Sequence, residues 1–385
     1  MYGVMEAKMN KEIISGKQAI SIFICFFLGS SLIVGASTSA NQDSWIAVIL
    51  AVIAVLPILL VYARILKLYP GKNIYDIVLE VFGNFFGKLM TLLYVLYSIH
   101  LGALVMRNFS EFISVVAMPQ TPQFIFMMFM ALLVIYMIKS GIEVLGRWSQ
   151  FVVPIIIIAI IVVTILSIKD MKLSNIMPIF GDDIKKVPDS AFSMFAFPFA
   201  ESVLFTTLFA SIKPKDNPYK IFIYSAAIGF VIIIILTIRN ILVLGMPLGS
   251  SLYFPSYSST GIIAISDFFS RMEVLVAINF LLAGLVKICV CVFAATMGIA
   301  KIFNMKDNKS LATAATLLML TLTLIIYKST MEMFAWIDIY KYYAFPVQVI
   351  LPLIILIGAE IKSRAKQASA RDEENKISTE SLNPN

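Results

Sequence analysis

Long apolar runs recur along almost the whole of this 385-residue chain. About ten of these runs are each roughly twenty residues long, the length at which an α-helix spans the hydrocarbon core of a bilayer. The runs are continuously apolar and do not alternate, which excludes a transmembrane β-barrel. The sequence therefore predicts an all-α integral membrane protein with about ten transmembrane helices.

Composition and charge exclude several classes of protein. Hydrophobic residues make up 60% of the chain and charged residues only 14%, too few to cover a soluble domain. The net charge of +7 is spread over short loops, as in cytoplasmic loops of membrane proteins, so we expect no nucleic-acid partner. The single histidine and three cysteines show no metal-ligand spacing, and no catalytic motif is present. We therefore expect no cofactor, no metal and no enzyme activity.

The apolar pattern sets the expected spans. They are residues 18–37, 45–65, 85–115 (led by an amphipathic piece, 74–82), 122–138, 151–168, 191–212, 221–244, 272–300, 311–327 and 344–358. Residues 1–360 would form one transmembrane domain, with a first repeat over about 14–168 and a second over about 190–359. The polar segment 361–385 is predicted to be a disordered cytoplasmic tail.

The orientation in the membrane follows from the loop charges. Most lysines and arginines fall in the loops on the same side as the N-terminus. Loops rich in these residues stay in the cytoplasm. With an even number of spans, both termini are expected to be cytoplasmic.

Two expected spans contain residues that interrupt or loosen a helix near mid-membrane. The first span carries Gly29, Ser30 and Ser31, and the sixth carries Phe197 and Pro198. Close helix packing accounts for small residues or a proline in a membrane helix. However, these spans begin two five-helix halves, and paired central interruptions are typical of inverted-repeat transporters with a midplane site. Both interpretations remain open from the residues alone.

Two charged residues are placed deep in the predicted membrane. Glu201 lies near the middle of the sixth span, and Lys287 lies near the middle of the eighth. Because an isolated charge at that depth costs several kcal/mol, both should face the bundle interior. A direct pair between them is one possibility, with either a structural or a ligand-binding role. His100, on the third span, could line a cavity or be a satisfied interior histidine.

Several short motifs, in a fixed order, resemble one family. They are Gly-Lys-Gln-Ala-Ile at 16–20, Leu-Gly-Ser-Ser-Leu-Ile at 28–33, Tyr-Pro-Gly-Lys-Asn at 69–73, Arg-Asn-Phe-Ser-Glu-Phe at 107–112, Ile-Met-Pro-Ile-Phe-Gly at 176–181, Phe-Pro-Phe-Ala-Glu at 197–201 and Arg-Met-Glu at 271–273. Together they resemble the B subunit of bacterial spore nutrient germinant receptors, in the amino-acid permease (APC) superfamily. The resemblance covers nearly all of residues 10–365.

This resemblance implies a LeuT-like five-plus-five inverted repeat with helices 1 and 6 broken. The protein would lie in the spore inner membrane with receptor A and C subunits, bind a small germinant such as an amino acid, and trigger germination. The ligand-binding residues that the resemblance carries over are Gly29, Ser30, Ser31, His100, Leu101, Phe197, Pro198, Glu201, Val286 and Lys287. The sequence departs from the family pattern at Ala200, where glycine is expected, which bears on the size of the pocket.

Three functions remain as hypotheses from the sequence. The first is the germinant-receptor subunit, with a ligand carboxylate on the interruption of helix 1 and its amine on helix 6 or Glu201. The second is a proton- or cation-coupled amino-acid permease, since one fold serves both roles. The third is a structural or channel-forming membrane subunit without its own ligand site.

Overall fold

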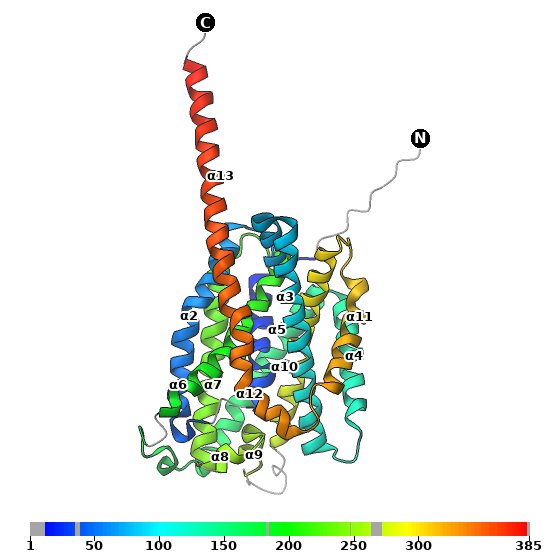
Figure 1. The fold of residues 1–385 in the computed structure, drawn as a ribbon. Helices are drawn as coiled ribbons and strands as arrows, with labels where there is room; N and C mark the ends of the chain where they lie inside the picture. Colours follow the sequence, from blue (N-terminus) through cyan, green and yellow to red (C-terminus); the bar gives the residue numbers. More distant parts are fainter. Residues whose placement is uncertain (1–11, 35–38, 182–184, 247, 263–271, 383–385) are drawn as a thin grey trace.

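The computed structural model describes residues 12–34, 39–181, 185–246, 248–262 and 272–382. Over these residues the chain is a bundle of helices, and its only pairing of extended backbone is one isolated bridge between Ile14 and Ile212. Within the described part of the chain, eight helices are long and apolar enough to cross a bilayer, and two further apolar helices, Gly16–Leu32 and Lys309–Ile325, are shorter. Figure 1 shows the arrangement of the helices in the bundle. The predicted all-α membrane fold is confirmed.

The helices follow the apolar runs because lipid offers no partner to a free peptide group, so each run satisfies its backbone internally. The first half contains α1 (Gly16–Val34), α2 (Ser44–Leu68), α3 (Ile74–Phe112), α4 (Gln123–Ser140) and α5 (Ile142–Leu166). The second half contains α6 (Val187–Met194), two irregular segments η6 (Phe195–Phe199) and η7 (Ala200–Ser211), α7 (Pro218–Leu244), the short α8 (Leu248–Ser251) and α9 (Pro255–Gly261), α10 (Glu273–Ile302), α11 (Ala312–Ile325), α12 (Thr330–Phe345), η10 (Pro346–Ile350) and α13 (Leu351–Leu382).

α1 and α10 form the centre of the bundle. Every side chain of α1 from Ile22 to Leu28 is buried, and so is every side chain of α10 from Leu285 to Thr296. A helix that is apolar and buried on all sides belongs to a core. The outer helices α4 and α5 instead expose large apolar side chains, as lipid-facing helices do. The centre of the bundle is therefore where a membrane-buried site can be formed.

Turn residues set the ends of several helices. Asn73 caps α3: its side chain accepts a hydrogen bond from the Asp76 backbone N–H at 2.9 Å. Gly141, with φ +99°, allows the chain to pass directly from α4 into α5. Gly83, with φ +76°, bends α3 after its first turns, where the sequence predicts an amphipathic lead piece. The predicted division of the third span is thus confirmed.

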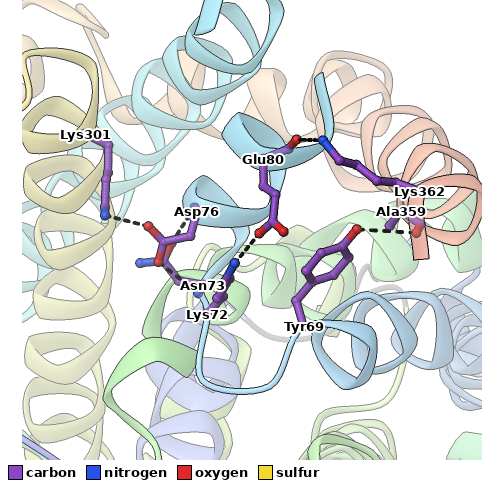
Figure 2. A network of polar contacts seen from close by, with 8 residues as sticks. All are labelled: Tyr69, Lys72, Asn73, Asp76, Glu80, Lys301, Ala359 and Lys362. Atoms are coloured by element: carbon purple, nitrogen blue, oxygen red, sulfur yellow. Dashed lines mark hydrogen bonds and ion pairs between the residues drawn. The ribbon is translucent and has the colours of Figure 1, made fainter. Parts of the chain in front are cut away.

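A polar network holds one end of the bundle together (Figure 2). Lys301 at the end of α10 pairs with Asp76 of α3 at 2.5 Å, and Lys72 pairs with Glu80. Lys362 of α13 donates to the backbone oxygen of Glu80. The first turns of α3 are therefore fixed to α10 and α13.

The structure differs from the sequence prediction at the C-terminal end. The tenth span was predicted to begin at residue 344, but the helical stretch begins at Thr330, fourteen residues earlier, and runs through α12 and η10 into α13. Charged residues in α12 lower the mean hydropathy of this segment, so the apolar pattern did not predict it as part of the span. One of them, Lys341, is 3% exposed and paired with Asp189. The predicted disordered tail is helical to Leu382 and extends beyond the bundle (Figure 1), consistent with its many helix-favouring Ala, Lys, Arg and Glu residues.

Candidate ligand-binding site

The sixth span is interrupted where the sequence predicts. α6 ends at Met194, and Phe197 has extended backbone angles (φ −134°, ψ 117°) inside η6. Pro198 explains this conformation, because it lacks an N–H group and biases the preceding residue away from the helical region. The interruption leaves backbone groups without helical partners in the interior of the protein.

Glu201 and Lys287 form a direct ion pair beside this interruption. Lys287 Nζ lies 2.5 Å from Glu201 Oε2, and both side chains are fully buried. The ammonium group also lies 5.2 Å from the ring centre of Phe26 and 4.9 Å from that of Phe197. Two opposite charges in contact avoid most of the cost of isolated charges in a membrane interior. Of the arrangements that the sequence leaves open, the structure has the direct pair.

A chain of polar side chains extends from this ion pair. Tyr340 of α12 donates to Glu201 Oε1 at 2.8 Å, and its oxygen lies 2.9 Å from the Tyr97 hydroxyl of α3. Gln348 donates through Nε2 to the Tyr97 oxygen at 2.8 Å and to the freed Ala196 carbonyl at 2.9 Å. The network therefore links the charged pair to the interruption through hydrogen bonds from α3, α12 and η10. A change at Glu201 would alter hydrogen bonds that involve all three elements.

A small cavity lies against the same carboxylate. Its volume is about 40 Å³, and Glu201 and Tyr340 form its polar side. The remaining lining residues are mostly apolar: Leu101, Leu104, Val105, Asn108, Phe197, Tyr327, Met333, Trp336 and Ile337. The Trp336 indole N–H is buried without a hydrogen-bond partner among the described residues. One water molecule needs about 15 Å³ of cavity volume. The cavity is therefore large enough for a few waters but too small for an amino acid.

α1 differs from the expectation at Gly29. The helix is continuous from Gly16 to Val34, so over these residues it has no interruption, and residues 35–38 lie outside the described part of the chain. Glycine is present there because α1 crosses α10 closely: a Cβ on Gly29 would lie 2.7 Å from Lys287 Cβ and 3.2 Å from the Ala283 carbonyl oxygen. The close-packing interpretation of this small-residue segment therefore applies to α1.

The other candidate residues have varied surroundings. Ser30 is fully buried and its hydroxyl has no partner among the described residues, whereas the Ser31 hydroxyl donates to the Phe27 carbonyl at 2.8 Å. Val286 is fully buried in α10. The His100 ring lies 4.9 Å from that of Tyr343, and His100 is not among the residues that line the cavity. The structure thus brings Leu101, Phe197 and Glu201 to the cavity. Lys287 is paired with the Glu201 carboxylate, and Gly29 packs against Lys287.

The sequence prediction missed the contribution of α12. Tyr340, Trp336, Met333 and Ile337 line the cavity, but they precede the tenth span as predicted. A helical spacing of three and four residues places these four side chains on one face, and this spacing was the available signal. Tyr97 was also missed, because one tyrosine in an apolar run carries no sequence signal.

A second buried charged pair lies on α3, next to the residues of this helix that line the cavity. Arg107 and Glu111 are 2.6 Å apart and nearly buried, as the i,i+4 spacing suggests, and Thr330 donates to Glu111 at 2.7 Å. Arg107 also donates to the Thr323 carbonyl at 3.3 Å. This pair fixes α3 against the α11–α12 connection, and its two residues flank the cavity residue Asn108 in the sequence.

This architecture, a helix interruption and a paired charge in the core of a bundle of apolar helices, has the LeuT fold, which this chain shares with known transporters. Solved structures support this class. MhsT in complex with L-phenylalanine gives a TM-score of 0.69 at 12% identity, covering 91% of this chain and 89% of that one. The nucleobase-cation-symport-1 transporter MHP1, closed with bromovinylhydantoin bound, gives 0.65 at 11% identity, covering 90% and 78%. At these identities the likeness shows the fold alone.

The chain belongs to the spore germination protein family of permease-like proteins, whose sequence model matches residues 13–333. Spore germination protein KB of Bacillus subtilis (strain 168) is 28% identical over 373 residues, covering 96% of this chain and all of that protein. Putative spore germination protein YfkT of the same organism is 25% identical over 328 residues, covering 85% and 89%. Membership of this family and the apolar helices of the structure together indicate a multi-pass membrane protein with a transporter-like fold.

Proposed function

We propose that this protein is the ligand-sensing membrane subunit of a spore germinant receptor, and that it binds a small nutrient germinant, such as an amino acid, at the cavity beside Glu201. The observation that carries this proposal is the buried carboxylate at the helix interruption, which faces an apolar cavity and is hydrogen-bonded to Tyr340 of a different helix. Family membership supports the role in germination.

The arrangement suits a zwitterionic ligand. A ligand ammonium group can take the place of the Tyr340 hydroxyl on Glu201 Oε1, with Lys287 still balancing the other oxygen. The ligand carboxylate can accept hydrogen bonds from the Trp336 indole and Asn108, since both residues line the cavity. This replaces the expected contact with freed N–H groups of α1, because α1 is continuous at Gly29.

The size of the cavity suggests how binding becomes a signal. A volume of about 40 Å³ is far below the several hundred Å³ of ordinary ligand sites, so this state is contracted. A ligand therefore selects a state in which α12 moves away from η7. We propose that receptor A and C subunits, in the spore inner membrane, respond to that movement, with both termini of this chain in the cytoplasm.

The first test is thermal stability of the purified protein against panels of amino acids, sugars and nucleosides. A true ligand at about one hundred times its Kd stabilises the protein by about 2.7 kcal/mol, which raises Tm by several degrees. Leu104→Phe fills the cavity and should abolish the shift. Leu96→Phe, the same substitution on the lipid-exposed face of α3, should preserve it. A ligand that stabilises both variants equally would place the site elsewhere.

The second test separates sensing from transport. Spores carrying Leu104→Phe should lose the germination response to that ligand, and spores carrying Leu96→Phe should keep it. The alternative function is a proton- or cation-coupled amino-acid permease. The Lys287 ammonium supplies a fixed positive charge beside the site in place of a coupling cation, which disfavours Na⁺ as the coupling ion. Uptake of the labelled ligand into proteoliposomes would support the transporter, and binding without uptake would support the receptor.

A further inference from the structure

One buried cation differs from the others in its surroundings. Four lysine or arginine residues are almost fully buried among the described residues: Arg107, Arg239, Lys287 and Lys341. Three of them contact a carboxylate: Glu111 at 2.6 Å, Glu201 at 2.5 Å and Asp189 at 2.5 Å respectively. Arg239, which is 1% exposed, forms no ion pair within the described part of the chain.

The groups that hold the Arg239 guanidinium are all neutral. Nη2 donates to Asn240 Oδ1 at 3.0 Å, to Ser259 Oγ at 3.3 Å and to the Ser256 carbonyl at 3.4 Å. Asn240 and the two serines are also hydrogen-bonded to one another, which fixes the guanidinium in place. Nε is buried and has no partner among the described residues. Among the described residues, the site therefore provides an oriented cation that has no carboxylate partner and one N–H group that has no acceptor.

A small void lies directly against this residue. Its volume is about 10 Å³, and it lies where α1, α5, α7 and α10 meet. Asn279, which is 3% exposed, is the second polar residue on its wall, and the others are Leu32, Ala159, Ile160, Val163, Leu236 and Val276. A void of this size holds about one water-sized particle, which excludes an amino acid, a phosphate or a sulfate.

We propose that this void is a binding site for one small monovalent anion, such as chloride, held by the Arg239 guanidinium and the Asn279 amide. A water molecule would satisfy the free N–H group but would leave the positive charge uncompensated in a low-dielectric interior, which costs several kcal/mol. A single anion satisfies both requirements. Arg239 is five residues from the end of α7, or about 8 Å, so the site lies close to that end of the bundle.

The anion would hold the centre of the bundle together near that surface. Leu32 of α1 and Asn279 of α10 both line the void, and the same two helices carry Gly29 and the Lys287 that pairs with Glu201. The anion site is nevertheless separate from the proposed germinant site, because the two sets of lining residues have no member in common.

The test is binding of radioactive chloride to the purified full-length protein by scintillation proximity, with Tm measured in parallel in sodium chloride and in sodium gluconate of equal ionic strength. The wild type should bind chloride saturably, and 150 mM chloride should raise Tm by about 3 °C over gluconate. Bromide should substitute for chloride, and sulfate should not. Arg239→Leu, which removes the charge without leaving an unpaired carboxylate among its described neighbours, should lose both responses.

Lys341→Met is the matched control. It removes another nearly buried cation, but one that already has a carboxylate partner, so both chloride responses should remain. Absence of saturable chloride binding by the wild type would overturn the proposal whether or not the variants fold. So would unchanged binding by Arg239→Leu. Loss of chloride binding in Lys341→Met as well would also refute the assignment to Arg239.

Discussion

Breaking the Glu201–Lys287 pair on one side should destabilise the protein more than removing both charges. Lys287→Met leaves a carboxylate that is fully buried, with only the Tyr340 hydroxyl bound to it. Leaving one member of such a pair uncompensated costs about 3–5 kcal/mol. The double variant Glu201→Gln/Lys287→Met has no buried charge, and Gln can still accept the Tyr340 hydrogen bond. We expect it to recover at least half of the loss.

The assay is thermal unfolding in a fixed detergent at one scan rate, followed by intrinsic fluorescence. At roughly 2 °C per kcal/mol, the single variant should lose about 6–10 °C in Tm. Lys341→Met serves as the control, because its partner Asp189 is 57% exposed and regains water when the lysine is removed. We expect a much smaller loss there, of about 1 kcal/mol.

Two outcomes would refute this reasoning. If Lys287→Met and Lys341→Met lowered Tm equally, the loss of stability would not depend on how deeply the remaining carboxylate is buried. If the double variant were less stable than either single variant, the pair would contribute net stability of its own, contrary to the desolvation argument.

Two further predictions concern packing and capping. Gly29→Ala adds a Cβ at 2.7 Å from Lys287 Cβ and close to the backbone of α10. It should lower the free energy of unfolding by about 1–3 kcal/mol, measured as a lower Tm than that of the wild type. An unchanged Tm would show that α1 and α10 pack less closely than described. Asn73→Ala removes the cap of α3 and should cost about 1 kcal/mol, whereas Asn73→Ser should restore most of it, because serine can accept the same hydrogen bond from the Asp76 N–H.

Much of the architecture could be read from the chain alone. Apolar runs of bilayer length gave the spans, and Pro198 gave the interruption of the sixth one, since a missing N–H group acts locally. Burial of Glu201 and Lys287 followed from their depth along their helices. The ligand-binding roles of the ten candidate residues, the division into two repeats and the orientation in the membrane remain predictions.

The errors share a cause. α12 was placed outside the membrane because Lys341 and its acidic neighbours lower the local hydropathy, but Lys341 is balanced by Asp189, which is 152 residues away. Gly29 was expected to interrupt α1, but the absence of a side chain there allows α10 to pack closely against α1. In both cases a partner distant in sequence decided what the residue does.

The sequence by itself determined that the chain is a helical membrane protein, where most of its helices lie, and that two charges must be hidden in its core, because these follow from bilayer thickness and the cost of a charge in lipid. Only the tertiary structure decided that these charges meet, that Tyr340 and Tyr97 extend the pair across α12 and α3, and that Arg239 lacks a carboxylate partner within the described residues. Contacts between distant segments depend on how helices cross, and helix crossing depends on the packing of many small and large side chains at once.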